Sequence, residues 1–371
     1  MRKSSYFIGG IVLLVIIAAS CSKSDDTPAI DPYAAIKVTF GSSIDPDNLA
    51  NYAGQVIPSY IVKDNTGGNP ITNAKATLGR VLFYDKNLSI SNTISCASCH
   101  KQEFAFSDIA LVSSGVEGGV TGRHSMRLIN ARFAVESKFF WNERAASLEQ
   151  QTTQPVQDHA EMGFSGQSGR PGIAALLTKL QALNYYNELF RFVYGDINVT
   201  EARLQECLAQ FVRSIQSFDS KYDAGRALVA NDNQNFPNFT AQENMGKNLF
   251  LSPPVFDATG NRVNGGLGCN GCHQAPEFDI APNSGNNGII GIINNPGIDI
   301  ANTRAPSLRD LVKTNGLLNG PMMHTGVIKT LQAAVGHYGT INLAPGNTNL
   351  DPKLRPNGFG QQLHLTAPEV D

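Results

Sequence analysis

Two short motifs constrain the fold of this 371-residue chain more than any other feature. Each places two cysteines three positions apart, with a histidine directly after the second, in CASCH at residues 96–100 and CNGCH at residues 269–273. Such a motif can be a redox dithiol, half of a zinc site, or the attachment point of a haem. The rest of the chain must decide between these three.

A haem accounts for every residue of both motifs. A redox dithiol is expected at a helix start within a βαβ unit, and neither motif has that context. A zinc site would leave both histidines without a role. In a c-type haem site, both thiols bind the vinyl groups and the histidine binds the iron. The predicted thioether-forming cysteines and proximal iron ligands are Cys96, Cys99, His100, Cys269, Cys272 and His273.

The first 20 residues resemble a signal peptide of the lipoprotein type. Arg2 and Lys3 precede a short apolar run, and small residues precede Cys21. We expect lipid attachment at Cys21, with ordinary secretion as the alternative. The run is too short for a comfortable membrane span, so the lipid would be the membrane attachment. The expected location is the periplasm or outer membrane of a Gram-negative envelope, with residues 21–70 as a tether and N-terminal extension.

Composition argues against a nucleic-acid partner and predicts a loop-rich helical protein. Charged residues make up 16% of the chain, the formal net charge is −2, and no basic run follows the first few residues. The 35 glycines and 19 prolines favour many turns around short helices, with little sheet. Cys207 lies at helical spacing within residues 200–218, with Thr200 as the expected N-cap. We expect it to be a semi-buried thiol without chemistry.

The chain shows an internal duplication. LGRVLF at residues 78–83 precedes the first haem motif, and MGKNLF at residues 245–250 precedes the second. The second segment opens with Thr240 and Glu243, the spacing of a capping box. We therefore expect a mostly α fold with two cytochrome-c-like helical domains, each around one haem, and long loops.

The expected domain boundaries follow from this duplication. The N-terminal haem domain would span residues 71–228, and the C-terminal haem domain would span residues 236–371. The boundary falls in the asparagine-rich stretch of residues 229–239.

A larger ordered set of motifs resembles the bacterial di-haem cytochrome c peroxidase family, which includes the MauG-type tryptophylquinone maturases. The resemblance runs from about residue 76 to the C-terminus. Its landmarks are LGRVLFYDKNLSISNTISCASCH, FAFSD, GRHSMRLINARF, FFWNERAASLEQQTTQPVQDHAEMG, CNGCH, RAPSLRDL and MMHTGVIKTLQAAVGHYG. The resemblance implies that the first haem reacts with peroxide and that the second relays electrons.

The resemblance also implies the site residues around the first haem. Glu161 matches the distal acid–base residue, Gln151 its hydrogen-bonding neighbour, and Trp141 the tryptophan between the haems. Arg144 would support the site or bind a propionate, and His159 is expected at the surface. The chemistry agrees, because peroxide reduction needs a group that moves a proton between the two oxygens and a polar donor for the developing charge.

One departure from the family concerns the first haem. Many relatives rest with a second histidine on this iron, from the loop after the motif, and residues 101–123 contain no histidine or methionine. We therefore expect an open or water-bound iron that needs no reductive activation, with His124 as the alternative cap. His124 also replaces an asparagine that helps relatives bind an inter-domain calcium, so a calcium site here is doubtful.

A second departure concerns the far ligand of the second haem. Relatives use methionine or tyrosine, and the matching position is Tyr338, which shares a helical stripe with Leu331. His337 is the alternative, and Met322 or Met323 are further candidates. The identity matters because methionine holds the haem potential high, whereas an anionic phenolate or a second histidine lowers it.

Three functions remain open from the sequence. The first is reduction of hydrogen peroxide with electrons from a small periplasmic cytochrome or similar carrier. The second is a MauG-like oxidase or maturase acting on a protein or small molecule. The third is a non-enzymatic electron-transfer cytochrome, although a pure carrier has no need of Gln151 and Glu161. A homodimer is typical of relatives. LTAPEVD at residues 365–371 resembles the start of the last family helix, so we expect a truncated product or a differently closed second domain.

Overall fold

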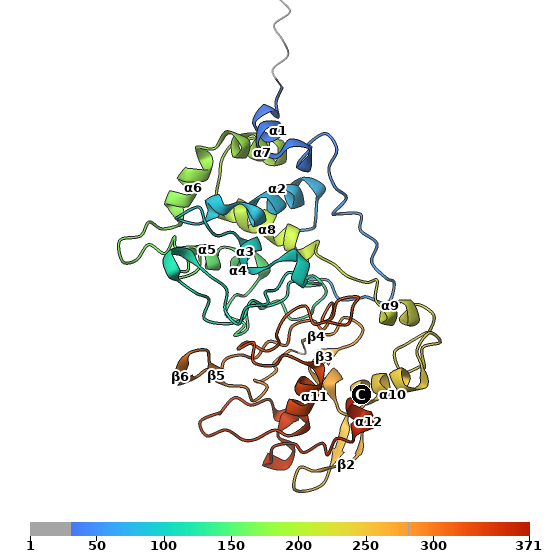
Figure 1. Cartoon of the computed structure of the whole chain (residues 1–371). Helices are drawn as coiled ribbons and strands as arrows, with labels where there is room; N and C mark the ends of the chain where they lie inside the picture. The colour runs from blue at the N-terminus through green and yellow to red at the C-terminus, as the bar shows by residue number, and fades with distance from the viewer. Residues whose placement is uncertain (1–30, 281) are drawn as a thin grey trace, which may run out of the picture. The chain divides into compact units, whose positions relative to one another are not determined.

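The structure is a computed structural model that describes residues 31–280 and 282–371 (Figure 1). The expected signal peptide and the expected lipidation site at Cys21 lie outside the described residues. Residues Tyr33–Asp371 form one compact unit, and the expected division of the chain into two haem domains stays a prediction. In the described part of the chain, no helix has the length and apolar character needed to cross a membrane.

Short helices joined by long loops dominate the described residues, as the composition predicts. The α-helices are α1 (Ala34–Phe40), α2 (Asn73–Tyr84), α3 (Cys96–Cys99), α4 (Leu148–Thr152), α5 (Gln154–Gln157), α6 (Ile173–Gln181), α7 (Asn184–Tyr194), α8 (Glu201–Arg213), α9 (Lys221–Arg226), α10 (Ala241–Leu251), α11 (Leu331–Gly339) and α12 (Ala367–Val370). Single 3₁₀ turns are η1 (Gly41–Ser43), η2 (Lys86–Leu88), η3 (Gln102–Phe104), η4 (Val116–Gly118), η5 (Cys269–Gly271), η6 (Pro352–Leu354) and η7 (Pro356–Gly358).

The strands of the described residues form small antiparallel hairpins and no larger sheet. The pairs are β1 (Pro254–Phe256) with β2 (Arg262–Gly265), β3 (His273–Gln274) with β4 (Asp279–Ile280), and β5 (Gly291–Ile292) with β6 (Asn295–Ile298). Because β3 begins at His273, the second haem motif runs directly into a hairpin.

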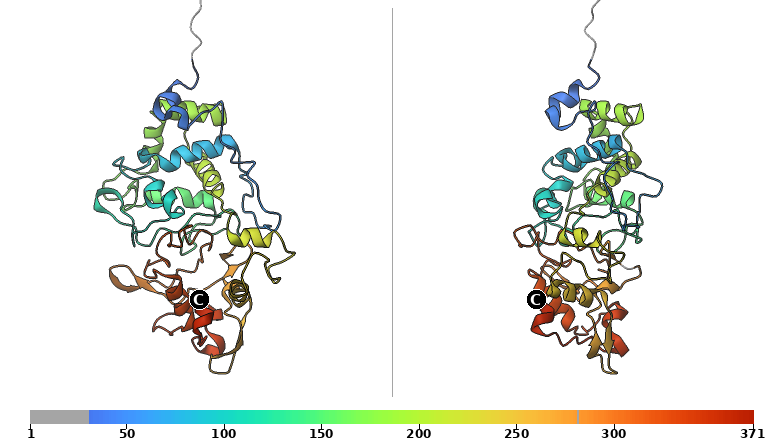
Figure 2. Two further views of the ribbon diagram at one scale, coloured as in Figure 1. Left: turned by 45° about the vertical axis from the view of Figure 1, so that its right-hand side comes forward. Right: turned by 90° about the vertical axis from the view of Figure 1, so that its right-hand side faces the viewer.

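Helix α2 packs against α8 and contacts α3, which carries the first haem motif. Helices α2 and α8 lie side by side (Figures 1 and 2) and approach closely because Gly79 has no side chain. A Cβ atom at Gly79 would lie 1.9 Å from the main-chain oxygen of Cys207. The helices bury the core residues Leu78, Val81, Leu82, Phe83, Leu204, Leu208 and Phe211.

Helix α8 confirms most of what its sequence predicts. The Thr200 side chain accepts a hydrogen bond from the main-chain N–H of Arg203 and caps the helix. Cys207 is fully buried rather than semi-buried, because it lies where α8 packs closely against α2. The helix also ends at Arg213, earlier than the predicted stripe, where the hydroxyl of Ser214 donates to the Phe211 carbonyl.

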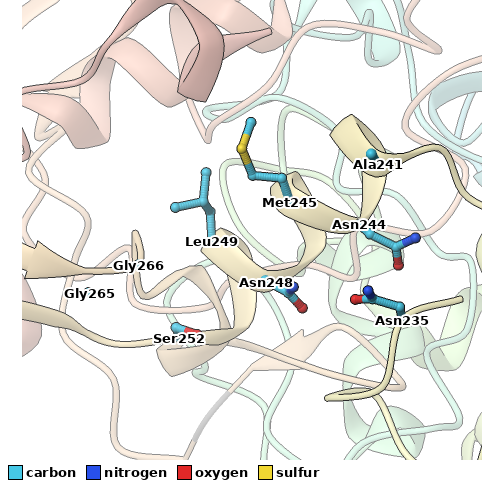
Figure 3. Close-up of a pocket in the computed structure, with 9 residues that line it drawn as sticks. All are labelled: Asn235, Ala241, Asn244, Met245, Asn248, Leu249, Ser252, Gly265 and Gly266. Carbon is cyan, nitrogen blue, oxygen red and sulfur yellow. The ribbon is translucent and has the colours of Figure 1, made fainter.

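Helix α10 repeats the α2 sequence pattern but not its packing. The predicted capping box forms between Thr240 and Glu243. A Cβ atom at Gly246, which matches Gly79, would meet nothing within 4 Å. Side chains of α10 instead line a pocket (Figure 3). The volume of this pocket is about 430 Å³. The C-terminal end of α10 still positions the second motif, because the Leu267 N–H donates to the Leu249 carbonyl at 2.7 Å.

The two matched glycines give a direct test of this difference. We expect Gly79→Ala to destabilise the folded protein by about 3 kcal/mol, since the new methyl group cannot fit against α8. Gly246→Ala should be neutral or stabilise by up to about 1 kcal/mol, as expected for an exposed glycine within a helix. Denaturant unfolding of the haem-loaded protein measures both, and equal effects would contradict the described packing.

Candidate functional site

The first haem motif lies on α3, whose single turn is held by a capping box between Ser95 and Ser98. Cys96 and Cys99 are free thiols rather than a disulfide. Burial raises the pKa of Cys96 to about 12 and that of Cys99 to about 11. Redox-active cysteine pairs have lowered pKa values that favour the thiolate. The environment therefore does not fit a redox dithiol, and it suits thiols that are consumed by covalent attachment.

A tight loop orients His100. The imidazole Nδ1 bonds the Phe106 carbonyl at 3.1 Å. Histidines that bind a metal through one ring nitrogen are commonly oriented by such a bond at the other. Ala105 and Phe106 both have φ of +55°, a conformation that is uncommon for non-glycine residues and often found at functional sites. Burial lowers the pKa of His100, so the ring is kept in the neutral form that coordinates iron.

The second haem motif shows the same environment. Burial raises the pKa values of Cys269 and Cys272 to about 11, and both are free thiols. Burial lowers the pKa of His273 to about 4, so this ring is also neutral. In the residues that the structure describes, the buried Nδ1 of His273 has no hydrogen-bond partner.

A half-buried arginine, Arg127, adds to the fit with haem. The Nε of Arg127 is buried and has no hydrogen-bond partner in the described chain. Burial lowers the pKa of Arg127 to about 10, and the charge of Asp310 opposes the shift. A haem propionate is a carboxylate that would pair with this guanidinium. Four free thiols, two neutral histidines and this cation together fit two covalently bound haems.

Glu161 lies close to the first motif with an ionisable carboxyl in an unusual environment. Its carboxyl makes no hydrogen bond within the described residues. Burial and, to a lesser extent, the negative charge of Asp158 raise the pKa of Glu161 to about 7, and the positive charge of Arg144 opposes the shift. The charge of Glu161 in turn raises the pKa values of the Cys96 and Cys99 thiols, so the carboxyl lies within the range of charge interaction with the first motif.

The other residues predicted near Glu161 are Gln151, Arg144 and His159. Gln151 is half-buried on α4, and no hydrogen bond joins its side chain to Glu161 in the described chain. Arg144 lies near enough to Glu161 for the two charges to interact. His159 is exposed, and its Nδ1 bonds the hydroxyl of Ser165 at 2.9 Å, in agreement with its expected surface position.

Trp141 contacts both halves of the chain. Its indole Nε1 donates to the His124 carbonyl at 2.8 Å. Its own carbonyl accepts the main-chain N–H groups of Thr303 at 2.9 Å and Arg304 at 3.0 Å. The indole also lies edge-on to His324, with the ring centroids 6.2 Å apart. Trp141 is therefore held between segments that follow the first and second motifs.

His124 is fixed by protein contacts on every side. Nδ1 bonds the Ala110 carbonyl at 2.9 Å, Nε2 bonds the Ser107 hydroxyl at 3.3 Å, and the main-chain N–H donates to the His324 carbonyl at 2.7 Å. Either ring nitrogen would have to give up its present hydrogen bond before it could bind an iron. Within the described ranges, no group of three or more His, Cys, Asp or Glu side chains could hold a metal ion.

The candidate ligands of the second haem meet around Asn287, for which the sequence pattern had no signal. Tyr338 lies on α11. Burial is the main cause that raises the pKa of its hydroxyl, and the charges of Cys272 and Cys269 add to the shift, so Tyr338 lies near the second motif. The Asn287 side-chain nitrogen lies 3.4 Å from the Tyr338 hydroxyl and 3.0 Å from the Met323 sulfur. His337 is engaged elsewhere, because its Nε2 bonds the Asn287 carbonyl at 2.8 Å.

The chain is similar to several known proteins. Residues 73–231 match the family model for di-haem cytochrome c peroxidase. The methylamine utilization protein MauG of Methylophilus methylotrophus is 30% identical over 277 residues, which cover 73% of each chain. Cytochrome c peroxidase Ccp of Escherichia coli K12 is 28% identical over 268 residues, 72% of this chain and 53% of that protein.

The fold has a solved counterpart as well. The crystal structure of a MauG-like protein associated with microbial copper homeostasis superposes with a TM-score of 0.61 at 25% identity. The match covers 85% of this chain and 91% of that one. The comparisons thus confirm the family resemblance and agree with the mostly α fold.

Covalent attachment can be tested one motif at a time. We expect Cys96→Ala combined with Cys99→Ala to reduce the covalently bound haem from two per chain to one, because thioether bonds to the vinyl groups can no longer form. Haem staining of denaturing gels and a haem-to-protein ratio measure the loss. The control Cys207→Ala should retain both haems, and retention of both in the double variant would rule out attachment at the first motif.

Proposed function

The chain belongs to the di-haem cytochrome c peroxidase family, and from that premise we propose that it reduces hydrogen peroxide to water with electrons from a small periplasmic carrier. The observation that carries the proposal is the Glu161 carboxyl. It lies within the range of charge interaction with Cys96 and Cys99, and it has a pKa near 7 and no hydrogen-bond partner in the described chain. An acid–base group works best when its pKa lies near the working pH.

Two covalently held haems would supply the redox chemistry of this reaction. His100 would hold the first iron and His273 the second. Ionised Glu161 would take a proton from one peroxide oxygen and give it to the other, which leaves as water. Two electrons and two further protons complete the reduction to two water molecules. Arg144 would moderate the charge at this carboxyl, and Gln151 would supply a polar donor after a side-chain adjustment.

Trp141 would provide the path between the two haems. Its indole is fixed by the His124 carbonyl, and its main chain is fixed by Thr303 and Arg304. A rigid aromatic ring between the two halves suits electron transfer better than a mobile one, because the distances along the path stay constant.

A MauG-like oxidase is the second candidate. Two observations favour it: the 30% identity to a MauG protein, and Tyr338 rather than methionine on α11 beside the second motif. The two enzymes differ in their electron source. After reaction with peroxide, a peroxidase is re-reduced by a reduced small cytochrome, whereas an oxidase of this kind is re-reduced by the substrate that it oxidises.

The role of Glu161 predicts a large kinetic effect. We expect Glu161→Gln to slow the reaction of the oxidised protein with hydrogen peroxide by about 100- to 10,000-fold, the range for loss of an acid–base group. Rapid-mixing absorbance gives this rate. The exposed Glu103, changed to Gln, is the matched control and should leave the rate unaltered. A rate within a few-fold of wild type for Glu161→Gln would remove Glu161 from the mechanism.

The same carboxyl predicts a pH dependence. Ionised Glu161 is the form that accepts the peroxide proton, so the rate should rise with pH and level off above a midpoint near 7. Asp158→Asn removes a charge that raises the pKa of Glu161, while it keeps the oxygen that accepts the main-chain N–H of Glu161 at 3.0 Å. The midpoint should therefore move to lower pH. A flat profile, or a shift upward, would contradict this role.

A further inference from the structure

Asn287 lies in a loop that is fixed on both sides. The preceding residue, Asn286, is fully buried, and its main-chain N–H donates to the Asn349 carbonyl at 2.8 Å. Its carbonyl accepts the N–H of Asp351 at 2.9 Å. The following residue, Gly288, has φ of +88°, a left-handed conformation that suits glycine. The main chain around Asn287 therefore has little freedom to move.

The orientation of the Asn287 amide is also fixed. Its side-chain oxygen accepts the main-chain N–H of Ile289 at 3.1 Å, and its main-chain carbonyl accepts a hydrogen bond from His337 at 2.8 Å. Because the Ile289 N–H can bond only the oxygen of the Asn287 amide, the amide nitrogen faces the opposite way. That nitrogen carries two N–H groups, and these point toward Tyr338 and Met323.

Both acceptors of this amide are side chains that can bind a haem iron. The amide nitrogen lies 3.0 Å from the Met323 sulfur and 3.4 Å from the Tyr338 hydroxyl. Met323 has φ of +70°, an uncommon conformation for a non-glycine residue. Such strained residues persist where the surrounding structure holds them and are concentrated at functional sites. The side-chain amide of Asn287 thus contacts two side chains, Met323 and Tyr338, that could each bind the second haem iron.

We propose that Asn287 is a positioning residue that selects Tyr338 over Met323 as the sixth ligand of the second haem. This rests on the proposed haem at the second motif. An N–H donor stabilises a charged phenolate oxygen more than a neutral thioether, because hydrogen bonds to ionised acceptors are stronger. The second N–H of the same amide bonds the Met323 sulfur and holds it in its present position. Asn287 thereby favours the oxidised second haem.

Asn287→Leu tests the proposal, because leucine has a similar size and no N–H donor. The ligand set of the purified di-haem protein is read by electron paramagnetic resonance and near-infrared magnetic circular dichroism. We expect phenolate signals to weaken and thioether signals to appear. At a fixed solution potential, the ratio of oxidised to reduced second haem should fall about tenfold. This change corresponds to a midpoint potential about 59 mV higher for a one-electron couple. Asn287→Ala should give the same changes if leucine prevents folding.

Control variants separate the possible causes. Met323→Leu added to the Asn287 variant should remove the thioether signals, and Asn287→Gln should restore part of the wild-type spectrum. Tyr338→Phe should change the ligand signals by itself. An unchanged spectrum and potential in both Asn287→Leu and Asn287→Ala would overturn the proposal, and so would an unchanged spectrum in Tyr338→Phe. The peroxide reaction of the oxidised protein tests the proposed function separately, because Asn287 is not part of the first site.

Discussion

A neutral, half-buried histidine beside two protonated thiols is the arrangement on which both sites depend. An imidazole without charge is ready to bind a metal, and thiols with raised pKa values are poor redox groups until they react. The surrounding fold creates this state twice. Helix α2, which packs against α8 at Gly79, contacts the helix α3 that carries the first motif. The end of α10 holds the second motif through the Leu249 carbonyl.

The two sites are coupled through one side chain and its main-chain partners. Trp141 bonds His124 from the first half and Thr303 and Arg304 from the second. His124 bonds His324 through main-chain groups, and the ring of His324 lies against the indole. A disturbance at any of these contacts would therefore move the indole, which makes Trp141 the shared element of the two proposed haem sites.

Much of this was readable from the sequence because the signals are local. The two haem motifs, the Thr200 cap and the Thr240 capping box each depend on residues within a few positions of one another. The resemblance to a known family supplied Glu161 as a candidate, and the structure added the burial and the charge of Asp158 that give its carboxyl a pKa near 7.

The remaining features depend on contacts between distant segments. Asn287 meets Met323 and Tyr338 only because the chain folds back, and no sequence period marks that meeting. Similar local sequences also gave different packing at Gly79 and Gly246, since a helix face does not encode what covers it. The expected pairing of Gln151 with Glu161 stays a prediction, since no hydrogen bond joins these side chains in the described chain.

The central claim is an open first haem with an acid–base group beside it. The most direct test mixes the fully oxidised di-haem protein with one equivalent of hydrogen peroxide and follows the absorbance spectrum rapidly. A fast loss of the high-spin ferric signal without prior reduction is the predicted result. A spectrum that stays unchanged until one electron is added would mean that a side chain, with His124 the first candidate, caps the iron and contradicts the account.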